Sequence, residues 1–325
     1  MSRQMLILTV ALAAYALLSV AASIVVALAW RSTIARHPHA SPVIRARRLL
    51  WLRASSSLWP ALLTLGVVTP AFAIFEPDRP SEVVGPVVIV LALVASIQIA
   101  VSLGIALAAA LRTRAAVRTW LHGSVQLNLD PPAGVPAYVI DAAAPIVALV
   151  GSFRPKLVAA RSVIKACTAA ELAAIVAHER RHLYSRDNLK RLLLACAPDA
   201  LRWTAAHQQI AAAWNDAAED AADDAATPGD AASRVDLAAL LIKIARLTPQ
   251  RVWPAATISP FVEPQELDRR VRRLLEGEAA CSNRGSRRVT SILLIAMTLA
   301  VAGLAQPESL KRIYDLVEAL IGLGR

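Results

Sequence analysis

Two histidines and a glutamate near the middle of the chain have the types and spacing needed for metal-dependent hydrolysis. His178 and His182 are separated by three residues, and Glu179 directly follows the first histidine. The Ala-, Leu-, Glu- and Arg-rich surroundings favour a helix, in which residues four apart share a face and can share one ion. The glutamate then reaches a water on that ion rather than the ion itself. This His-Glu-x-x-His pattern is typical of zinc hydrolases and predicts Glu179 as the catalytic carboxylate.

A catalytic zinc site needs a third protein ligand and leaves the fourth position to water. The acidic segment 214–224 offers one, because Glu219 and Asp223 lie four residues apart and project from the same side of a helix. One carboxylate can bind the metal while the other holds a histidine ring by a hydrogen bond. Asp216 and Asp220 share much of that face, and a solvated acidic face is the alternative, so spacing alone leaves the third ligand open.

The composition excludes an ordinary soluble protein. Of the 325 residues, 56% are hydrophobic and only 5% aromatic, and the mean hydropathy is +0.50. Four stretches are almost free of charge and long enough to cross a bilayer core at about 1.5 Å per residue; they comprise residues 5–30, 57–75, 86–111 and 289–305. The sequence therefore predicts a mainly α membrane protein with four transmembrane helices.

The net charge of +11 follows the expected membrane topology. Residues 31–56 contain six arginines and no acid, arginines flank the third and fourth stretches, and the loop 76–82 is net negative. The positive-inside rule places residues 31–56 and 112–288 in the cytoplasm, which predicts a multi-pass protein of the inner (cytoplasmic) cell membrane. Anionic lipid head groups are the expected partners of the basic excess. No nucleic-acid-binding motif accompanies the charge, so we expect no direct contact with nucleic acid.

The segment 112–288 is predicted to be an α+β domain inserted between the third and fourth membrane helices. Short apolar runs at 137–140, 145–151 and 156–160, broken by Pro and Gly, predict a small sheet. Thr168 and Glu171 match a capping box that opens the helix of His178. Periodicity predicts further helices at 188–197, 201–226, 233–247 and 265–276. The predicted organisation is a membrane domain (1–111), a cytoplasmic zinc-metallopeptidase domain (112–288), a fourth span (289–305) and an external amphipathic tail (306–325).

Several further segments match one family when they are taken together. The motif at 178–182 continues as Leu-Tyr-Ser-Arg-Asp-Asn, and Glu-Asp-Ala-Ala-Asp-Asp follows at 219–224. The segments 145–155 and 267–275 also resemble segments of this family. These motifs and the plan of the spans resemble the BlaR/MecR-type antirepressor membrane zinc metallopeptidases. The resemblance covers nearly the whole chain. It implies zinc ligation by His178, His182 and Glu219, catalysis by Glu179, support of a ligand by Asp223, and a role in signal transduction through cleavage of a transcriptional repressor. The polar linker 277–288 is, by its composition and its tether to the active site, a candidate site at which the chain cleaves itself.

One departure from this family bears on the stimulus. The sensor members carry a large external penicillin-binding domain after the fourth span, whereas this sequence ends about twenty residues beyond it. We therefore expect a short external tail and no penicillin-binding sensor domain. Two alternatives stay open: a housekeeping membrane protease of the HtpX or CAAX-processing type, and a catalytically silent membrane signalling scaffold. Intact Glu179 argues against the scaffold, because a structural zinc site needs no base. The sequence indicates neither the substrate nor the oligomeric state.

Overall fold

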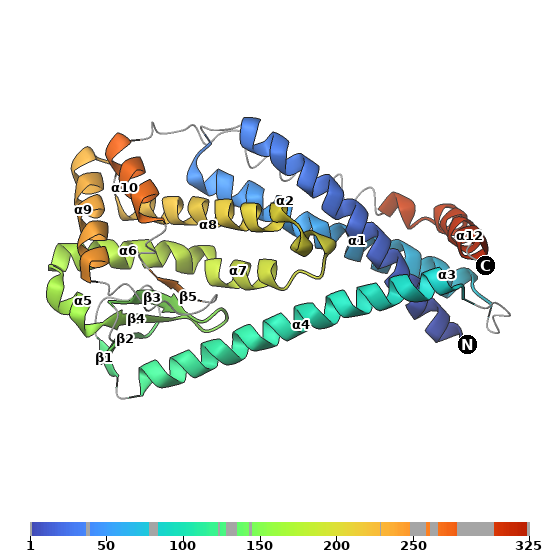
Figure 1. Ribbon diagram of the computed structural model, residues 1–325, viewed down its shortest axis with the longest axis horizontal. Coiled ribbons are helices and arrows are strands. Elements are labelled where there is room, and N and C mark those ends of the chain that lie inside the picture. The colour runs from blue at the N-terminus through green and yellow to red at the C-terminus, as the bar shows by residue number, and fades with distance from the viewer. Residues whose placement is uncertain are drawn as a thin grey trace.

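In a computed structural model, long helices lie at one end of the protein, and a small sheet with packed helices lies at the other (Figure 1). Both termini lie at the end with the long helices. The structure describes residues 2–36, 40–77, 84–122, 124–127, 135–142, 145–227, 229–247, 258–260, 266–277 and 302–323. Within these residues the chain is mostly helical, as the composition predicts.

Three helices of the described residues are long and apolar enough to cross a membrane. They are α1 (Arg3–Arg36), the continuous helix formed by α2 (Pro42–Leu63), a π-helical turn (Thr64–Val68) and α3 (Thr69–Phe75), and α4 (Pro86–Leu121). The second helix starts well before the apolar stretch at 57–75, and α4 continues past residue 111, where the sequence predicts the end of the membrane domain. Both extensions carry arginines that end the apolar stretch without ending the helix. The predicted fourth span at 289–305 lies almost entirely outside the described residues.

A five-stranded sheet forms one layer of the part of the chain that follows α4. Its order is β1 (Val125–Leu127), β2 (Ala137–Ile140), β4 (Lys156–Ala160), β3 (Val147–Val150) and β5 (Ile258–Pro260). Strands β2 and β4 are parallel and all other neighbours are antiparallel. The three apolar runs of the sequence become β2, β3 and β4, whose residues are mostly buried, so this prediction is confirmed.

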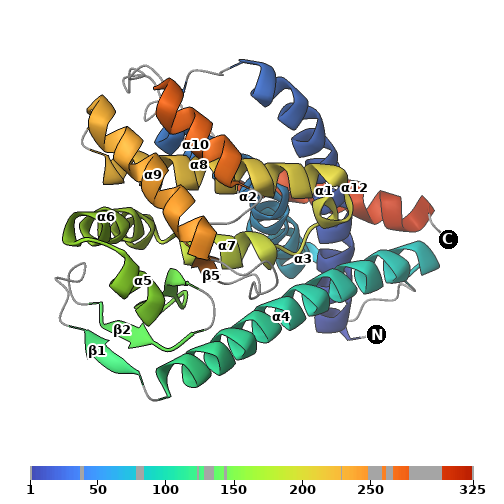
Figure 2. The same ribbon diagram turned by 60° about the vertical axis from the view of Figure 1, so that its left-hand side comes forward.

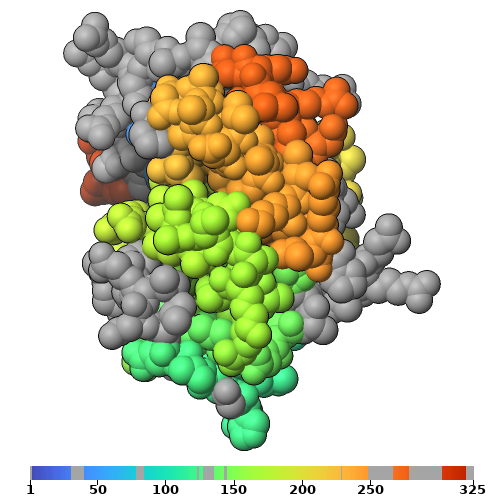
Figure 3. Space-filling view, turned by 90° about the vertical axis from the view of Figure 1, so that its left-hand side faces the viewer, coloured from blue at the N-terminus to red at the C-terminus, as the bar shows by residue number. Residues whose placement is uncertain are grey.

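The helices that follow β4 in the chain lie on one face of this sheet, and the C-terminal end of α4 packs against the other (Figure 2). In chain order they are α5 (Arg161–Ala166), α6 (Ala169–Ser185), α7 (Asp187–Ala195), a short 3-10 turn (Ala200–Trp203), α8 (Ala205–Ala226), α9 (Ala231–Leu247) and α10 (Leu267–Glu276). The capping box is confirmed, because Thr168 Oγ1 accepts from the Glu171 N–H and the Glu171 carboxylate accepts from the Thr168 N–H. At the end of the molecule seen in Figure 3, α9 lies between α10 and the helices α5 and α6. Apolar side chains of α6, α9 and the sheet share one core.

Two of the three long apolar helices, α1 and α2, pack directly on α8. Arg45 of α2 forms an ion pair with Asp220 of α8, and Trp30 Nε1 of α1 donates to Gln209 Oε1 at 2.9 Å. Farther along α2, the fully buried Arg53 pairs with buried Asp199 at 2.6 Å, just before the 3-10 turn that leads into α8. Buried apolar residues of α1, α2 and α8 pack around these contacts. Contacts with α1 and α2 therefore hold α8 in place.

The predicted amphipathic tail is a helix, α12 (Pro307–Leu323), at the same end as α3 (Figure 1). Its buried residues Leu310 and Tyr314 pack in one cluster with Phe72 of α3, and the rings of Tyr314 and Phe72 are 5.0 Å apart. Tyr314 Oη also donates to a Glu76 carboxylate oxygen at 3.2 Å. The apolar face of the tail is therefore used in contacts with α3.

Candidate active site

Helix α6 carries His178, Glu179 and His182, and all three side chains are almost completely buried. The helix ends at Arg186, which adopts a left-handed conformation with φ 54°. This conformation is uncommon for a residue other than glycine. It lets α7 begin at once with Asp187, so that the first side chain of α7 points back at the metal-ligand face of α6.

The structure brings together the three side chains that the resemblance implies as ligands. His178 Nε2 and His182 Nε2 are 3.1 Å apart, and carboxylate oxygens of Glu219 lie 3.3 Å from the first and 3.4 Å from the second. Two ligand atoms about 2.0–2.1 Å from a tetrahedral zinc ion are about 3.3–3.4 Å apart. The donor set of two imidazoles and one carboxylate, with these separations, therefore fits a zinc ion that keeps one open position.

The rotation of α8 separates Glu219 from the neighbouring carboxylates that share its face in the sequence. Asp220 turns away from the histidines and pairs with Arg45 of α2 and Arg269 of α10. Asp216 lies 3.1 Å from the Nε of the same Arg269. Neither residue belongs to the metal-binding group among the described residues. Of Asp216, Glu219 and Asp220, Glu219 is therefore the one whose carboxylate lies beside Nε2 of both histidines.

Each histidine also meets a buried carboxylate on its other ring nitrogen. Asp223 Oδ1 lies 3.1 Å from His178 Nδ1, the role that the resemblance implies for it. Asp187 Oδ2 lies 2.9 Å from His182 Nδ1, and the sequence analysis did not assign Asp187 a role. Such contacts place a proton on Nδ1 and leave Nε2 free to bind metal. Asp187 belongs to the Arg-Asp-Asn segment, which the sequence analysis used only as one of the motifs that resemble a known family.

Two arginines offset the negative charge of these buried carboxylates. Arg270 of α10 lies 3.3 Å from Glu219 Oε2 and donates through Nε to Asp223 Oδ2 at 2.9 Å. Arg191 of α7 donates to Glu219 Oε1 at 3.1 Å. Burial by itself raises the pKa of Asp223, but the charge of Arg270 and the contact with His178 outweigh it and hold this pKa at about 2. The pKa of Glu219 is also well below its usual range, because His182, His178 and Arg270 outweigh its burial. Both carboxylates are therefore ionised at neutral pH.

Glu179 has a different environment from these carboxylates. Its Oε2 accepts the Leu149 N–H at 3.1 Å, which ties it to strand β3. Its Oε1 is buried and has no hydrogen-bond partner among the described residues. Burial raises the pKa of Glu179 in spite of the two nearby histidines, which lower it. A carboxylate with a free, buried oxygen and a raised pKa is suited to accept and return a proton.

Residues 95–256, about half of the chain, match the model of a known family, which is described as Peptidase family M48. This match supports the M48 metallopeptidase family. The M48 region contains His178, Glu179, His182, Glu219 and Asp223, and ends before β5 and α10. The match indicates a hydrolase that acts as a metallopeptidase, and it does not confirm the BlaR/MecR type. No curated protein and no solved structure matched the chain significantly.

Within the M48 region, Arg191 is a second polar group that the sequence analysis did not single out. Its Nε donates to Asn215 Oδ1 at 3.0 Å, and its guanidinium lies 5.7 Å from the centre of the Trp214 ring. With Nη2 on Glu219, three contacts fix this side chain. The remaining nitrogen, Nη1, is buried and has no hydrogen-bond partner among the described residues. The guanidinium therefore holds a fixed, unused donor beside the ligand carboxylate.

Strand β5 lies next to the strand that contacts Glu179. It pairs with β3 so that Ser259 lies opposite Leu149, the residue whose N–H reaches Glu179. The edge of β3 that faces the active-site helix is thus already paired with a segment of the same chain. Because three residues are too few to show a period, the sequence did not predict this strand.

Proposed function

We propose that this protein is an integral membrane, zinc-dependent endopeptidase that cleaves cytoplasmic or membrane-proximal protein segments. One observation carries the proposal: the donor triangle of His178, His182 and Glu219 lies beside the unpaired, buried oxygen of Glu179. A structural zinc site has no use for such an oxygen, whereas a hydrolytic site needs a group that takes a proton from water. This contrast favours the enzyme over a catalytically silent scaffold.

The residues of the site divide the reaction between them. A bound zinc ion supplies a Lewis acid that polarises the scissile carbonyl and activates water. Glu179 Oε1 accepts a proton from the attacking water, and the raised pKa of the carboxyl lets it return that proton to the leaving amine. Asp187 and Asp223 hold the imidazoles in the orientation that binds metal. Arg191 Nη1, a buried donor on the guanidinium that contacts Glu219, is the candidate donor to the negative charge that develops on the carbonyl oxygen.

The proposed role is regulatory and antirepressor-like, with a transcriptional repressor or the chain itself as substrate. The resemblance in the Arg-Asp-Asn and Glu-x-x-x-Asp-Asp segments supports this role. A housekeeping membrane protease uses the same ligand pattern and is the alternative. Comparing the proteins that persist in cells with and without the Glu179 carboxylate distinguishes the two: a regulatory protease changes one or a few repressors, and a housekeeping protease changes many membrane proteins.

We expect the purified full-length protein in detergent micelles to bind about one zinc ion per chain and to cleave an unfolded protein such as casein. Removal of the metal by a chelator should abolish cleavage, because the donor group of His178, His182 and Glu219 then holds no Lewis acid to polarise the scissile carbonyl, and added zinc should restore it. Metal analysis and gel electrophoresis of the products measure both effects. Cleavage that survives complete removal of metal would contradict the proposal.

We propose a cytoplasmic location for the peptidase region, which labelling of single cysteines in intact cells tests. A cysteine at position 230, between α8 and α9, should be shielded from a membrane-impermeant reagent. A cysteine at position 77, after α3, should react with it. The opposite pattern would place the peptidase region outside and change the class of substrate.

A further inference from the structure

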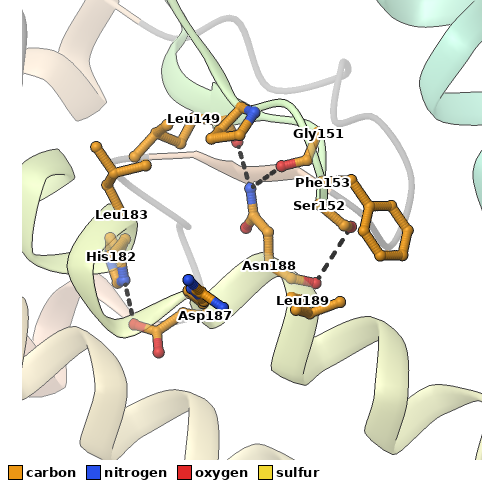
Figure 4. Close-up of a pocket in the computed structure, with 11 residues that line it drawn as sticks. Leu149, Gly151, Ser152, Phe153, His182, Leu183, Asp187, Asn188 and Leu189 are labelled. Atoms are coloured by element: carbon orange, nitrogen blue, oxygen red, sulfur yellow. Dashed lines mark hydrogen bonds and ion pairs between the residues drawn. The ribbon is translucent and has the colours of Figure 1, made fainter. Parts of the chain in front are cut away.

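A cavity of about 290 Å³ opens beside the metal-binding group (Figure 4). Its floor and walls come from the end of β3, the turn that follows β3, and the junction of α6 and α7. Five apolar side chains line it: Leu149, Phe153, Pro155, Leu183 and Leu189. This volume lies at the lower end of the range for small-ligand pockets and suits one or two side chains of a peptide.

The cavity adjoins the reacting groups through His182 and Leu149. His182 and Asp187 both line it, while Nε2 of the same His182 belongs to the metal-binding group. Leu149 also lines it, and the Leu149 N–H contacts Glu179. The cavity and the metal-binding group therefore share His182, and the cavity also adjoins the strand residue that holds Glu179. Because successive Cα atoms of a peptide are about 3.8 Å apart, a side chain in the cavity belongs to a residue next to the cleaved bond.

The walls of the cavity are fixed before any peptide binds. Asn188 Nδ2 donates to the Leu149 carbonyl at 2.8 Å, and Ser152 Oγ donates to the Asn188 carbonyl at 3.4 Å (Figure 4). Gly151 turns the chain here with φ +102°, and a Cβ on it would lie 3.0 Å from the Arg154 carbonyl oxygen. These contacts hold the turn against α7, so little ordering is required when a ligand enters.

Two features of the cavity indicate what it binds. Asn188 Oδ1 is buried and has no hydrogen-bond partner among the described residues, which leaves one acceptor for a ligand N–H. At the rim, Phe153 exposes 80% of its surface, an apolar contact that solvent does not favour. The lining also includes polar residues, namely Ser152, His182, Arg186, Asp187 and Asn188. Five apolar side chains together with the unused acceptor of Asn188 match a peptide residue that presents a large apolar side chain and a backbone N–H.

We propose that this cavity is a specificity pocket for a large aliphatic or aromatic residue of the substrate, next to the cleaved peptide bond. Leu183, Leu189 and Phe153 surround that side chain, and Asn188 Oδ1 accepts a hydrogen bond from a backbone N–H of the substrate. The inference rests on the proposed peptidase function and adds a substrate class: protein segments with such a residue at the cleavage site.

Digestion of a peptide library by the zinc-loaded, full-length protein in detergent tests the pocket. Sequencing of the products by mass spectrometry should show Leu, Ile, Met or Phe enriched at one position next to the cleaved bonds. Leu189→Trp fills the pocket and should lower kcat/KM for such peptides by at least about tenfold, while peptides with Ala at that position lose little. Leu193→Trp is the matched control, because Leu193 lies on the same helix and exposes 61% of its surface to solvent.

Binding of peptide hydroxamates gives a second readout that does not require turnover. Of two hydroxamates that differ only by a benzyl or a methyl side chain, the benzyl compound should bind at least about tenfold more tightly. Leu189→Trp should remove this preference, and so should Phe153→Ala, a change at an exposed residue that leaves the fold intact. Cleavage and hydroxamate binding without any side-chain preference would overturn the pocket. Absence of both cleavage and hydroxamate binding would instead overturn the peptidase function.

Discussion

Replacing Glu179 with glutamine is expected to abolish proteolysis while the protein keeps its zinc. The amide oxygen can still accept the Leu149 N–H, so the local structure stays, but the amide cannot take a proton from water. Loss of a general base costs about 10²–10⁴-fold in rate. Zinc analysis of the purified variant, together with cleavage of casein at neutral pH, measures the two effects separately.

Glu171→Gln is the matched control for this variant. Glu171 lies in the first turn of the same helix, and glutamine can keep its capping contact with Thr168. This variant should retain both zinc and activity. If Glu179→Gln instead loses its zinc, the residue is a ligand; if it keeps full activity, the base lies elsewhere.

Removing the Glu219 carboxylate is expected to lower zinc occupancy sharply. Glu219→Ala leaves two of the three ligands and two arginines, Arg191 and Arg270, without their shared partner. Asp216→Ala is the control, because Asp216 lies on the same helix, is partly exposed and contacts Arg269 instead of the histidines. Zinc retained after dialysis against a zinc buffer should fall in the first variant and stay unchanged in the second.

The carboxylates behind the histidines should give intermediate losses. Asp187→Ala and Asp223→Ala should each weaken zinc binding by about 10- to 100-fold, the usual scale for groups that orient a ligand. Both side chains are buried, so the melting temperature must be measured alongside zinc affinity. Equal zinc content in the Glu219, Asp187, Asp223 and Asp216 variants would place the third ligand elsewhere.

The sequence alone could identify the part of the site that lies within one helix. The spacing of His178 and His182 is local, and the capping box at Thr168 fixes where their helix begins. The choice of Glu219 is not local, because it depends on how α8 is rotated. That rotation is accompanied by the pairing of Asp220 with Arg45 and Arg269 and by the packing of Trp214 and Ala217 in a core with α1 and α2, all contacts between residues far apart in the sequence.

The supporting residues were hidden for the same reason. In the sequence, Arg191 and Arg270 cannot be distinguished from other charged residues on helices. Their contacts with Glu219 form only where α7, α8 and α10 meet. Asp187 reaches His182 through the left-handed conformation of Arg186, a position where sequence patterns favour glycine. Strand β5 consists of three residues that pair with a strand more than a hundred residues earlier, and such pairing leaves no periodic signal.

The contacts of α2 with the peptidase region limit how this enzyme can be cut, fused or recombined. Asp199 is fully buried, and its arginine partner, Arg53, and two of its hydroxyl donors, Ser56 and Ser57, all belong to α2. A fragment that starts with the M48 region would leave this carboxylate without its counter-charge, at a cost of about 3–5 kcal/mol. That is a large part of the about 5–15 kcal/mol that keeps a typical protein folded. The M48 region should therefore not fold when it is separated from α1 and α2. Chimaeras should exchange it together with these two helices.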